Sequence, residues 1–208
     1  IKGHQDTLFL GPLPLREAKP GGFIGPKQFA PRRVGRQYFR RCRIEGDVDF
    51  IFGGARAYFE GCEIRSLNRD MDVNGYVTAV STPQGEPYGF VFHGCSFTAD
   101  EGIAPGSVYL GRPWREWAQT VLLECWLGPH ISLEGWWDWN KPAAHDGTLY
   151  AGGALFGPAG DTAAWVPWAH CLTGQDSERY ARDRVLAGTD GWDPEGGDGD
   201  AVETAGLS

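Results

Sequence analysis

The sequence lacks an excess of positive charge, a long apolar run and a recognisable set of metal ligands. Its 19 lysines and arginines are outnumbered by 27 aspartates and glutamates, so the net charge of −8 argues against a general nucleic-acid binder. It contains no run of about 18 apolar residues, so no membrane-spanning segment is expected. The five cysteines include no C-x-x-C pair and the five histidines are scattered, so we expect no metal and no cofactor.

Glycine, proline and aromatic residues are plentiful. The chain of 208 residues has 31 glycines, 14 prolines and 13% aromatic residues, a composition typical of a turn-rich β protein with one sizeable core. Residues 195–208 carry almost no bulky apolar side chain, and we expect a disordered acidic tail there.

A cysteine pattern recurs along the chain. Cys42, Cys62, Cys95 and Cys125 each have an apolar residue three positions earlier and another two positions later. The intervals of 20, 33 and 30 residues between them are typical of a solenoid whose repeats differ in loop length. Because each cysteine shares a strand face with the residue two positions later, both should point inward. The pattern predicts stacked, buried free thiols rather than disulfides.

The segment GDVDFIFG, residues 46–53, places a carboxylate inside an apolar strand. Alternation along a strand would put Asp49 and Ile51 on one face and Val48, Phe50 and Phe52 on the other. An ionised carboxylate among apolar groups is costly unless a cation balances it, which favours a functional role for Asp49. The alternative, an aspartate that caps a turn after a glycine, suits Asp47 better.

Two further segments supply partners for that carboxylate. In LGRPW, residues 110–114, Arg112 stands between a glycine and a proline, which restrains a guanidinium that can clamp a carboxylate with two hydrogen bonds. In QDTL, residues 5–8, Gln5 adds an amide donor and Asp6 a second carboxylate. Each segment alone is unspecific, and an Arg before a Pro is usually a surface turn.

Together the three segments resemble the pectin methylesterases, in the order in which that family carries them. The likeness continues through GYVTA at 75–79, STP at 81–83, GWWDW at 135–139 and DGWDP at 190–194. The resemblance implies an all-β fold, a right-handed parallel β-helix, and hydrolysis of pectin methyl esters without a cofactor. It also implies a monomer when complete that acts outside the cell or in the cell envelope, although no signal peptide is present in this sequence.

The resemblance implies a role for each matching residue. Asp49 is the nucleophile, Asp6 the general acid and then base, Gln5 the oxyanion donor, and Arg112 the group that orients Asp49. A nearby guanidinium should lower the pKa of Asp49, and a neighbouring carboxyl without its own cation should have a raised pKa, as a proton donor requires.

Aromatic side chains are the expected walls of a sugar cleft, because flat rings suit the C–H face of a pyranose. Trp114 is the preferred candidate, with Trp136 and Trp139 as further candidates. The family places an aromatic residue of the Asp49 segment near the cleft, at Phe52 or at Phe50. Periodicity alone favours the core for Phe50.

The sequence also departs from the family pattern. Upstream Gln-Ala-Val and Gly-x-Tyr-x-Glu segments are absent, so the chain resembles the C-terminal two-thirds of a family member. We expect a β-helix that lacks its first coils over residues 1–173, a helical or irregular segment over 174–194, and an inserted loop over 11–35. Within 174–194, Asp176 or Ser177 is expected to cap a helix that runs to Leu186.

Two alternative functions remain open from the residues. A polygalacturonase or pectate lyase also uses a β-helix with acidic residues, but neither explains Arg112 in its LGRPW setting. A carbohydrate-binding or inactive remnant of an esterase is consistent with the absent segments. Release of methanol without new chain ends separates these possibilities.

Overall fold

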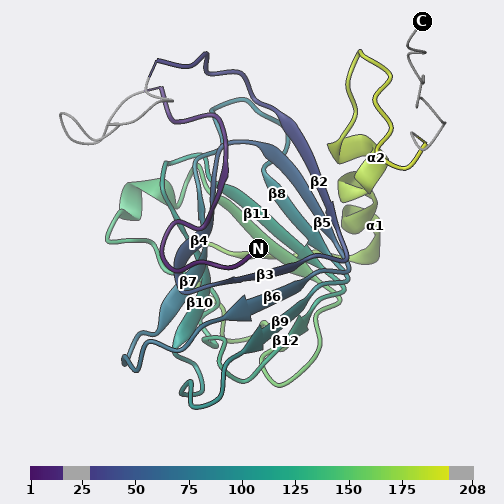
Figure 1. Ribbon diagram of the computed structural model, residues 1–208. Coiled ribbons are helices and arrows are strands. Elements are labelled where there is room, and N and C mark those ends of the chain that lie inside the picture. The colour runs from purple at the N-terminus through teal and green to yellow at the C-terminus, as the bar shows by residue number, and fades with distance from the viewer. Residues whose placement is uncertain (16–28, 197–208) are drawn as a thin grey trace, which may run out of the picture.

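The strands form three parallel sheets, which the chain visits in turn (Figure 1). The computed structural model describes residues 1–15 and 29–196. The first sheet contains, in spatial order, β1 (Leu8–Leu10), β4 (Val48–Gly53), β7 (Gly75–Val80) and β10 (Val108–Pro113). The second contains β14 (His170–Cys171), β13 (Leu149–Gly153), β11 (Gln119–Leu123), β8 (Phe90–His93), β5 (Arg56–Glu60) and β2 (Arg36–Arg40). The third contains β12 (Trp126–Leu127), β9 (Ser96–Ala99), β6 (Glu63–Ser66) and β3 (Arg43–Gly46).

Three successive coils each contribute one strand to every sheet. The chain runs through β2, β3 and β4, then β5, β6 and β7, then β8, β9 and β10, and each strand pairs in parallel with its counterpart in the next coil. The predicted all-β class and parallel β-helix are confirmed.

The interior consists of rows of equivalent residues from successive coils. Ile44, Ile64 and Phe97 occupy one row in register, and all three are buried. The rings of Phe59 and Phe92 stack with centroids 4.4 Å apart in a second row. These residues are the apolar neighbours of the repeated cysteines, so the solenoid predicted from that pattern is confirmed.

The cysteines of the repeat lie at equivalent corners and are free thiols. The Sγ of Cys62, Cys95 and Cys125 each donates over 3.4 Å to the carbonyl of a phenylalanine in the preceding coil. These three are buried, whereas Cys42 is only partly buried because the described residues place no equivalent thiol before it. The expectation of free thiols is confirmed, and that of complete burial is wrong for Cys42.

The C-terminal segment covers the outer face of the second sheet (Figure 1). The expected single helix is wrong in detail, because three short helices occur: α1 (Gly174–Ser177), η2 (Glu178–Tyr180) and α2 (Arg182–Val185). Thr173 caps α1, and its backbone N–H and hydroxyl donate to the carboxylate of Asp176 over 3.1 and 2.6 Å. Tyr180 and Leu186 belong to one buried apolar cluster with Tyr58 of β5, which anchors the segment.

A 3-10 helix, η1 (Pro142–Ala144), interrupts the loop before β13. Among the described residues, no helix has the length and hydropathy of a membrane span. Most of the predicted 11–35 insertion and of the predicted 195–208 tail falls on residues 16–28 and 197–208, which lie outside the described residues.

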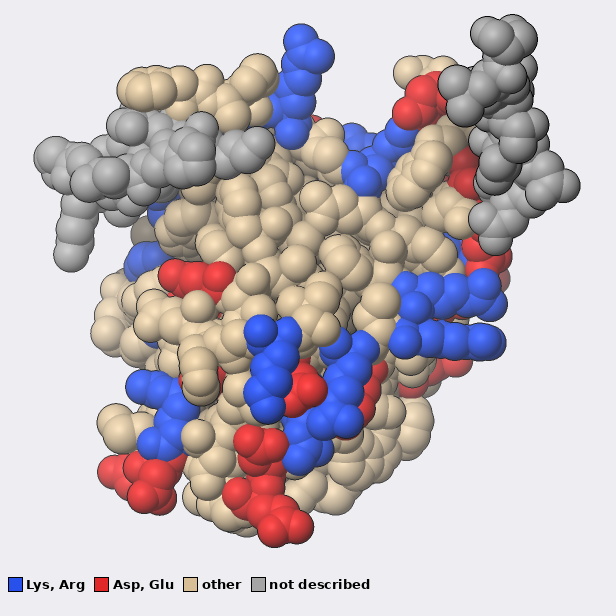
Figure 2. Space-filling model, in the orientation of Figure 1, with Lys and Arg blue, Asp and Glu red and all other residues tan. Residues whose placement is uncertain are grey.

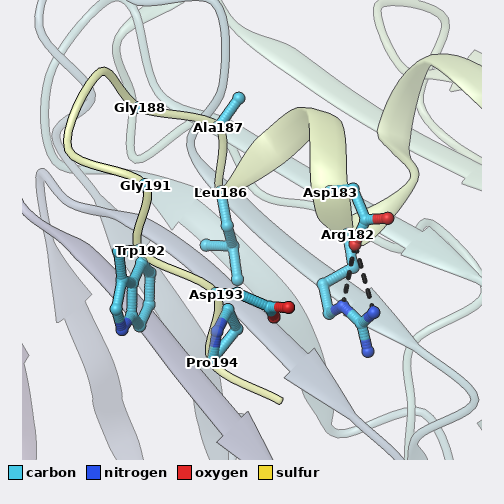
Figure 3. A pocket seen from close by; sticks show the side chains of 9 residues that line it. All are labelled: Arg182, Asp183, Leu186, Ala187, Gly188, Gly191, Trp192, Asp193 and Pro194. Carbon is cyan, nitrogen blue, oxygen red and sulfur yellow. Dashed lines mark hydrogen bonds and ion pairs between the residues drawn. The ribbon is translucent and has the colours of Figure 1, made fainter. Parts of the chain in front are cut away.

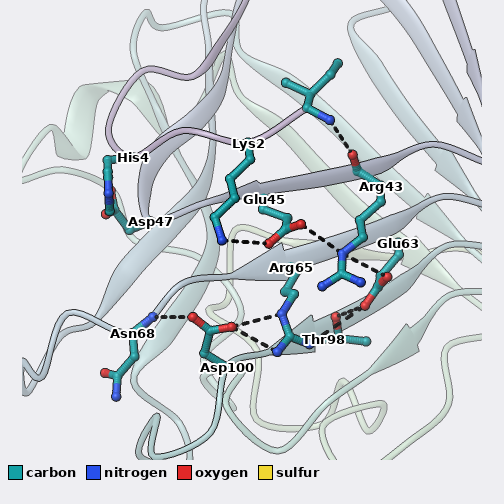
Figure 4. A network of polar contacts seen from close by, with 11 residues as sticks. Lys2, His4, Arg43, Glu45, Asp47, Glu63, Arg65, Asn68, Thr98 and Asp100 are labelled. Carbon is teal, nitrogen blue, oxygen red and sulfur yellow. Dashed lines mark hydrogen bonds and ion pairs between the residues drawn. The ribbon is translucent and has the colours of Figure 1, made fainter.

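Charged side chains of both signs alternate over the outer face of the third sheet (Figure 2). Lys2 lies 3.6 Å from Glu45, which also accepts from Arg43, and Arg65 pairs with Asp100 at 2.9 Å (Figure 4). The Lys2–Glu45 and Arg65–Asp100 pairs join neighbouring coils, so charges of opposite sign neutralise one another on this face.

Candidate active site

A bulge in β4 sets the direction of Asp49. The register between β4 and β7 shifts between Val48 and Ile51, and Asp49 has a left-handed φ of 51°. Such a bulge inserts one extra residue and re-aims the side chains around it. A left-handed φ is uncommon for a residue with a Cβ, so the bulge holds Asp49 in an unusual backbone conformation.

The bulge overturns the simple alternation expected for this strand. Phe50 and Ile51 are both fully buried in the core, whereas Asp49 and Phe52 line the same external pocket. The expectation that Asp49 and Ile51 share a face is therefore wrong, because one inserted residue shifts the alternation by one position.

Arg112 on β10 clamps Asp49 with two hydrogen bonds. Its Nε donates to Oδ1 over 2.7 Å and its Nη2 donates to Oδ2 over 2.6 Å. The two side chains are only 5% and 11% exposed, so water screens the pair weakly. This is the fork geometry expected from the sequence, and it joins residues two coils apart in the β-helix.

Aromatic rings hold the guanidinium of Arg112 on both sides. Its Cζ lies 3.9 Å from the ring centroid of Tyr76 and 3.7 Å from that of Trp139, with Trp137 at 5.5 Å. Trp139 also has a left-handed φ of 58°. Sequence reasoning missed Tyr76 and Trp137 as site residues, although both stand within motifs that it identified. Their aromatic character close to a buried arginine is the signal that could have found them.

The turn before β1 brings in Gln5 and Asp6. The backbone N–H of Asp6 donates to the carbonyl of Val48 over 3.0 Å, which fixes the turn on the strand that carries Asp49. Asp6, like Asp49, has a left-handed φ, here 55°. Two carboxylates from adjacent coils thus face one site, each on a constrained backbone.

These residues border one pocket with a volume of about 180 Å³. A cavity of this size is suited to a small group of a larger substrate rather than to a whole one. The lining brings together seven side chains singled out above and one alanine: Gln5, Asp6, Asp49, Phe52, Ala79, Arg112, Trp114 and Trp139.

The pKa values of the Asp49 and Asp6 carboxyls are shifted by different combinations of burial and neighbouring charge. Burial raises the pKa of Asp49, while the hydrogen bonds and charge of Arg112, and then the charge of Lys141, oppose that rise. The expectation that Arg112 holds this pKa below its usual range is wrong, because it counted the cation and left out desolvation. Each oxygen of Asp49 nevertheless faces a guanidinium N–H, which requires the ionised carboxylate.

The pKa of Asp6 is raised, as expected. Partial burial of its carboxyl is the larger cause and the negative charge of Asp49 the next, while Arg112 lowers the value. No cation forms a direct ion pair with Asp6 among the described residues, in contrast to the clamp on Asp49. Asp6 is therefore the carboxyl more readily protonated next to an ionised neighbour.

Lys141 stands behind the pocket. Its Nζ donates to the carbonyls of Pro113 and Trp114 over 2.9 and 3.3 Å and lies 4.2 Å from the ring centroid of Trp139. Burial, and then the charges of Arg115 and Arg112, lower the pKa of Lys141 to about 8. The sequence did not single out this residue, because nothing local marks a lysine that folds back onto a strand.

Two residues predicted to contact substrate are instead part of the core. Phe50 and Trp136 are both fully buried, and Trp136 stacks on Tyr150 with ring centroids 4.2 Å apart. Their assignment to the cleft is wrong: the bulge turns Phe50 inward, and Trp136 pairs with β10 at Gly111, where it closes the core of the next coil. Trp114, Phe52 and Trp139 remain as the aromatic lining.

A second hollow lies near the C-terminal helices, at α2 and the loop that follows it (Figure 3). Two of its charged members, Arg182 and Asp183, are hydrogen-bonded to each other, and Trp192 lies on the opposite side of the hollow. None of the carboxylates discussed above reaches it. Within residues 1–15 and 29–196, no group of histidine, cysteine and acidic side chains has the arrangement of a metal site.

Comparison with known proteins gives consistent matches. The family model described as Pectinesterase matches residues 32–189. The chain is 33% identical over 208 residues to the "Probable pectinesterase/pectinesterase inhibitor 23" of Arabidopsis thaliana, with 94% of this chain and 32% of that protein covered.

Solved structures match as well. A pectin methylesterase from carrot superposes with a TM-score of 0.67 and 29% identity, covering 74% of this chain and 51% of that one. A pectin methylesterase in complex with hexasaccharide VII superposes with a TM-score of 0.62 and 27% identity, covering 77% and 53%. The chain thus spans about a third of the curated relative and about half of each solved chain.

Proposed function

The chain belongs to the Pectinesterase family, and from that membership we propose that it hydrolyses the methyl esters of pectin to methanol and free carboxylates. The observation that carries this proposal is the clamped, buried Asp49–Arg112 pair in a pocket bordered by Asp6 and Gln5. An ionised carboxylate next to a carboxyl of raised pKa provides a nucleophile and a proton donor in one site.

In the first step, an oxygen of Asp49 attacks the carbonyl carbon of the methyl ester. Each Asp49 oxygen keeps a lone pair beyond the one that accepts from Arg112, so the clamp orients the nucleophile without consuming it. The amide of Gln5 stabilises the tetrahedral oxyanion, a contribution that is typically worth about 3 kcal/mol of barrier. The intermediate collapses to a mixed anhydride, and methoxide leaves with the proton of Asp6 as methanol.

In the second step, the ionised Asp6 takes a proton from water, and the resulting hydroxide attacks the anhydride. The bond between Asp49 and the acyl group breaks, and Asp6 is again protonated. The product forms as a carboxylic acid, which releases its proton to the solvent and leaves as a carboxylate. The charge of Arg112 stabilises the departing Asp49 carboxylate at this stage. Both aspartates return to their starting states, and one water is consumed for each methanol released.

The pocket walls suit a sugar chain. Trp114 lies with its ring centroid 5.9 Å from that of Phe52, and Trp139 closes the side above Arg112. Flat aromatic faces contact the C–H face of a pyranose while the ester group reaches Asp49. The solved relative that holds a hexasaccharide supports an oligosaccharide as the class of ligand.

The proposal extends to the setting of the reaction. We place the activity outside the cell or in the cell envelope, where methyl-esterified polygalacturonate occurs. Pectin is the partner, with no nucleic acid or membrane involved, and the complete protein acts as a monomer. The curated relatives with pectinesterase names support this setting by family likeness.

Product analysis tests the proposed reaction. The protein expressed from its complete gene should release methanol from methyl-esterified polygalacturonate without new reducing ends and without unsaturated ends. New reducing ends would indicate a glycosidase and unsaturated ends a lyase. Retention of the polysaccharide without methanol would indicate a binding protein, and any of these three results contradicts the proposal.

A further inference from the structure

A polar contact links the two coils that carry the proposed catalytic carboxylates. Nδ1 of His4 lies 2.7 Å from Oδ2 of Asp47, and Figure 4 shows the two side chains together beside the third sheet. His4 stands two residues before Asp6, and Asp47 stands two residues before Asp49. The contact therefore joins equivalent points upstream of both carboxylates.

Asp47 is fixed by its surroundings. Its side chain is only 6% exposed, and its Oδ1 accepts from the backbone N–H of Val48 over 2.7 Å. Its carbonyl accepts from the N–H of Tyr76 over 3.1 Å, and a Cβ on Gly75 would lie 2.0 Å from that carbonyl oxygen. Asp47 is thus held against the next coil, directly before the bulge that aims Asp49.

His4 connects this fixed point to the first turn. Its side chain is 81% exposed, so the ring contributes little to the core. The hydroxyl of Thr7 donates to the carbonyl of His4 over 2.7 Å, which closes the turn that contains Gln5 and Asp6. At the other end of that turn, the N–H of Asp6 donates to the carbonyl of Val48. The N–H of the same Val48 donates to the Asp47 side chain.

We propose that His4 and Asp47 are positioning residues, a cross-coil tether that sets the placement of Asp6 relative to Asp49. Asp6 and Asp49 both have left-handed φ values, an uncommon backbone conformation whose placement depends on the contacts that fix the chain on either side. The tether supplies such a contact between the segments that precede Asp6 and Asp49. The proposal rests on the proposed ester hydrolysis and adds residues that the family resemblance assigns no role.

The test compares three single variants in the protein expressed from its complete gene. His4→Ala removes the tether, and His4→Asn keeps an amide donor near the position of Nδ1. Lys2→Ala is the matched control, because it breaks the Lys2–Glu45 contact between the same two coils at 3.6 Å without touching the turn. Initial rates of methanol release give kcat and KM for each variant.

If His4 positions Asp6, its loss should change kcat and not KM. His4→Ala should lower kcat by about 10- to 100-fold, since small misplacements of reacting groups have effects of that order, and should leave KM almost unchanged. His4→Asn should restore most of the loss, and Lys2→Ala should match the wild type. A wild-type kcat for His4→Ala, an equal loss for Lys2→Ala, or no rescue by His4→Asn would overturn the proposal.

Hydrogen exchange separates this proposal from the proposed function. Protection of the Asp6 amide, which donates to Val48, should fall in His4→Ala and stay unchanged in Lys2→Ala. If the wild type releases no methanol, the proposed function fails, and exchange still decides whether the tether holds the turn. Unchanged protection in His4→Ala would overturn the tether whatever the activity.

Discussion

Arg112 is held by groups from several coils, and its shape matters as much as its charge. Two of its nitrogens donate to Asp49, and its plane lies between the rings of Tyr76 and Trp139. Lysine carries the same charge but lacks both the fork and the flat face. Arg112→Lys should therefore lower kcat by about 100-fold, measured as the initial rate of methanol release.

Arg65→Lys is the matched control for that variant. Arg65 also pairs with an aspartate, Asp100, but on the charged outer face of the third sheet. Its replacement should leave turnover unchanged. Near-normal turnover of Arg112→Lys would show that only the charge at this position matters.

Lys141 is expected to make stability depend on pH. Its pKa of about 8 lies below the ordinary value of 10.5, so between these values the unfolded chain binds more protons than the folded chain. Over that window the free energy of unfolding should rise with pH, because the penalty for burying the charged form disappears as folded Lys141 loses its proton.

Comparison with Lys141→Met isolates this contribution from other titrating groups. The wild type should gain about 1–2 kcal/mol relative to the variant between pH 7.5 and 10.5, a figure reduced for a half-exposed group. Urea unfolding at both pH values measures it. A difference between the two proteins that is independent of pH would contradict the lowered pKa.

Residue chemistry alone predicted part of this site. A carboxylate in an apolar strand requires a cation, because burying an unpaired charge costs free energy. The pairing of Asp49 with a restrained arginine could therefore be predicted. Tyr76, Trp137 and Lys141 could not be predicted in the same way. Tyr76 and Trp137 meet Arg112, and Lys141 meets Trp139, only after the coils are stacked. The sign of the Asp49 pKa shift was also out of reach, since it depends on burial.

At the scale of the element, β4 departs from regular strand geometry. The bulge buries Phe50 and leaves Phe52 in the pocket. Regular alternation would instead have placed both rings on the same face of the strand. Phe50→Ala should therefore destabilise the protein by about 3–5 kcal/mol, the usual cost of emptying a fully buried phenylalanine site. Urea unfolding measures this cost.

Phe52→Ala provides the complementary variant in the same strand. It should cost much less stability and should raise KM for methyl-esterified polygalacturonate, because its ring lies at the pocket wall beside Trp114. Equal stability losses for the two variants would contradict the bulge.

The rate at which each cysteine thiol reacts reports how tightly the coils pack around it. Cys171 is exposed and should react quickly with a thiol reagent, Cys42 more slowly, and Cys62, Cys95 and Cys125 only after denaturant is added. The hydrogen bond to Cys125 and then burial also raise the pKa of Cys95, which disfavours its reactive thiolate. Rapid reaction of all five thiols in the folded protein would contradict the stacked corners.

At the scale of the whole molecule, periodicity explains why the fold could be predicted from the sequence. The repeat around Cys42, Cys62, Cys95 and Cys125 recurs once per coil, so a local pattern reports the global architecture. The packing of the C-terminal helices on the second sheet carries no such repeat. The buried cluster that Tyr180 forms with Tyr58 of β5 could be recognised only from the structure.

The β-helix brings together residues far apart in the sequence. Asp6 lies just before β1, Asp49 lies on β4 and Arg112 lies on β10 of the same first sheet, although 106 positions separate Asp6 from Arg112. We propose that this juxtaposition makes Asp49 a nucleophile toward a methyl ester.

The most direct test is methanol release by Asp49→Asn in the protein expressed from its complete gene, with Asp100→Asn as the control. Asp100 also accepts from an arginine, but it lies on the third sheet, outside the pocket. Because an amide is nearly isosteric but a poor nucleophile, Asp49→Asn should still fold, although with lower stability because Arg112 loses its charged partner, and should lose at least about 1,000-fold in kcat. Asp100→Asn should stay within about twofold of the wild type. Methanol release by a folded Asp49→Asn protein within about tenfold of the wild-type rate would contradict the account.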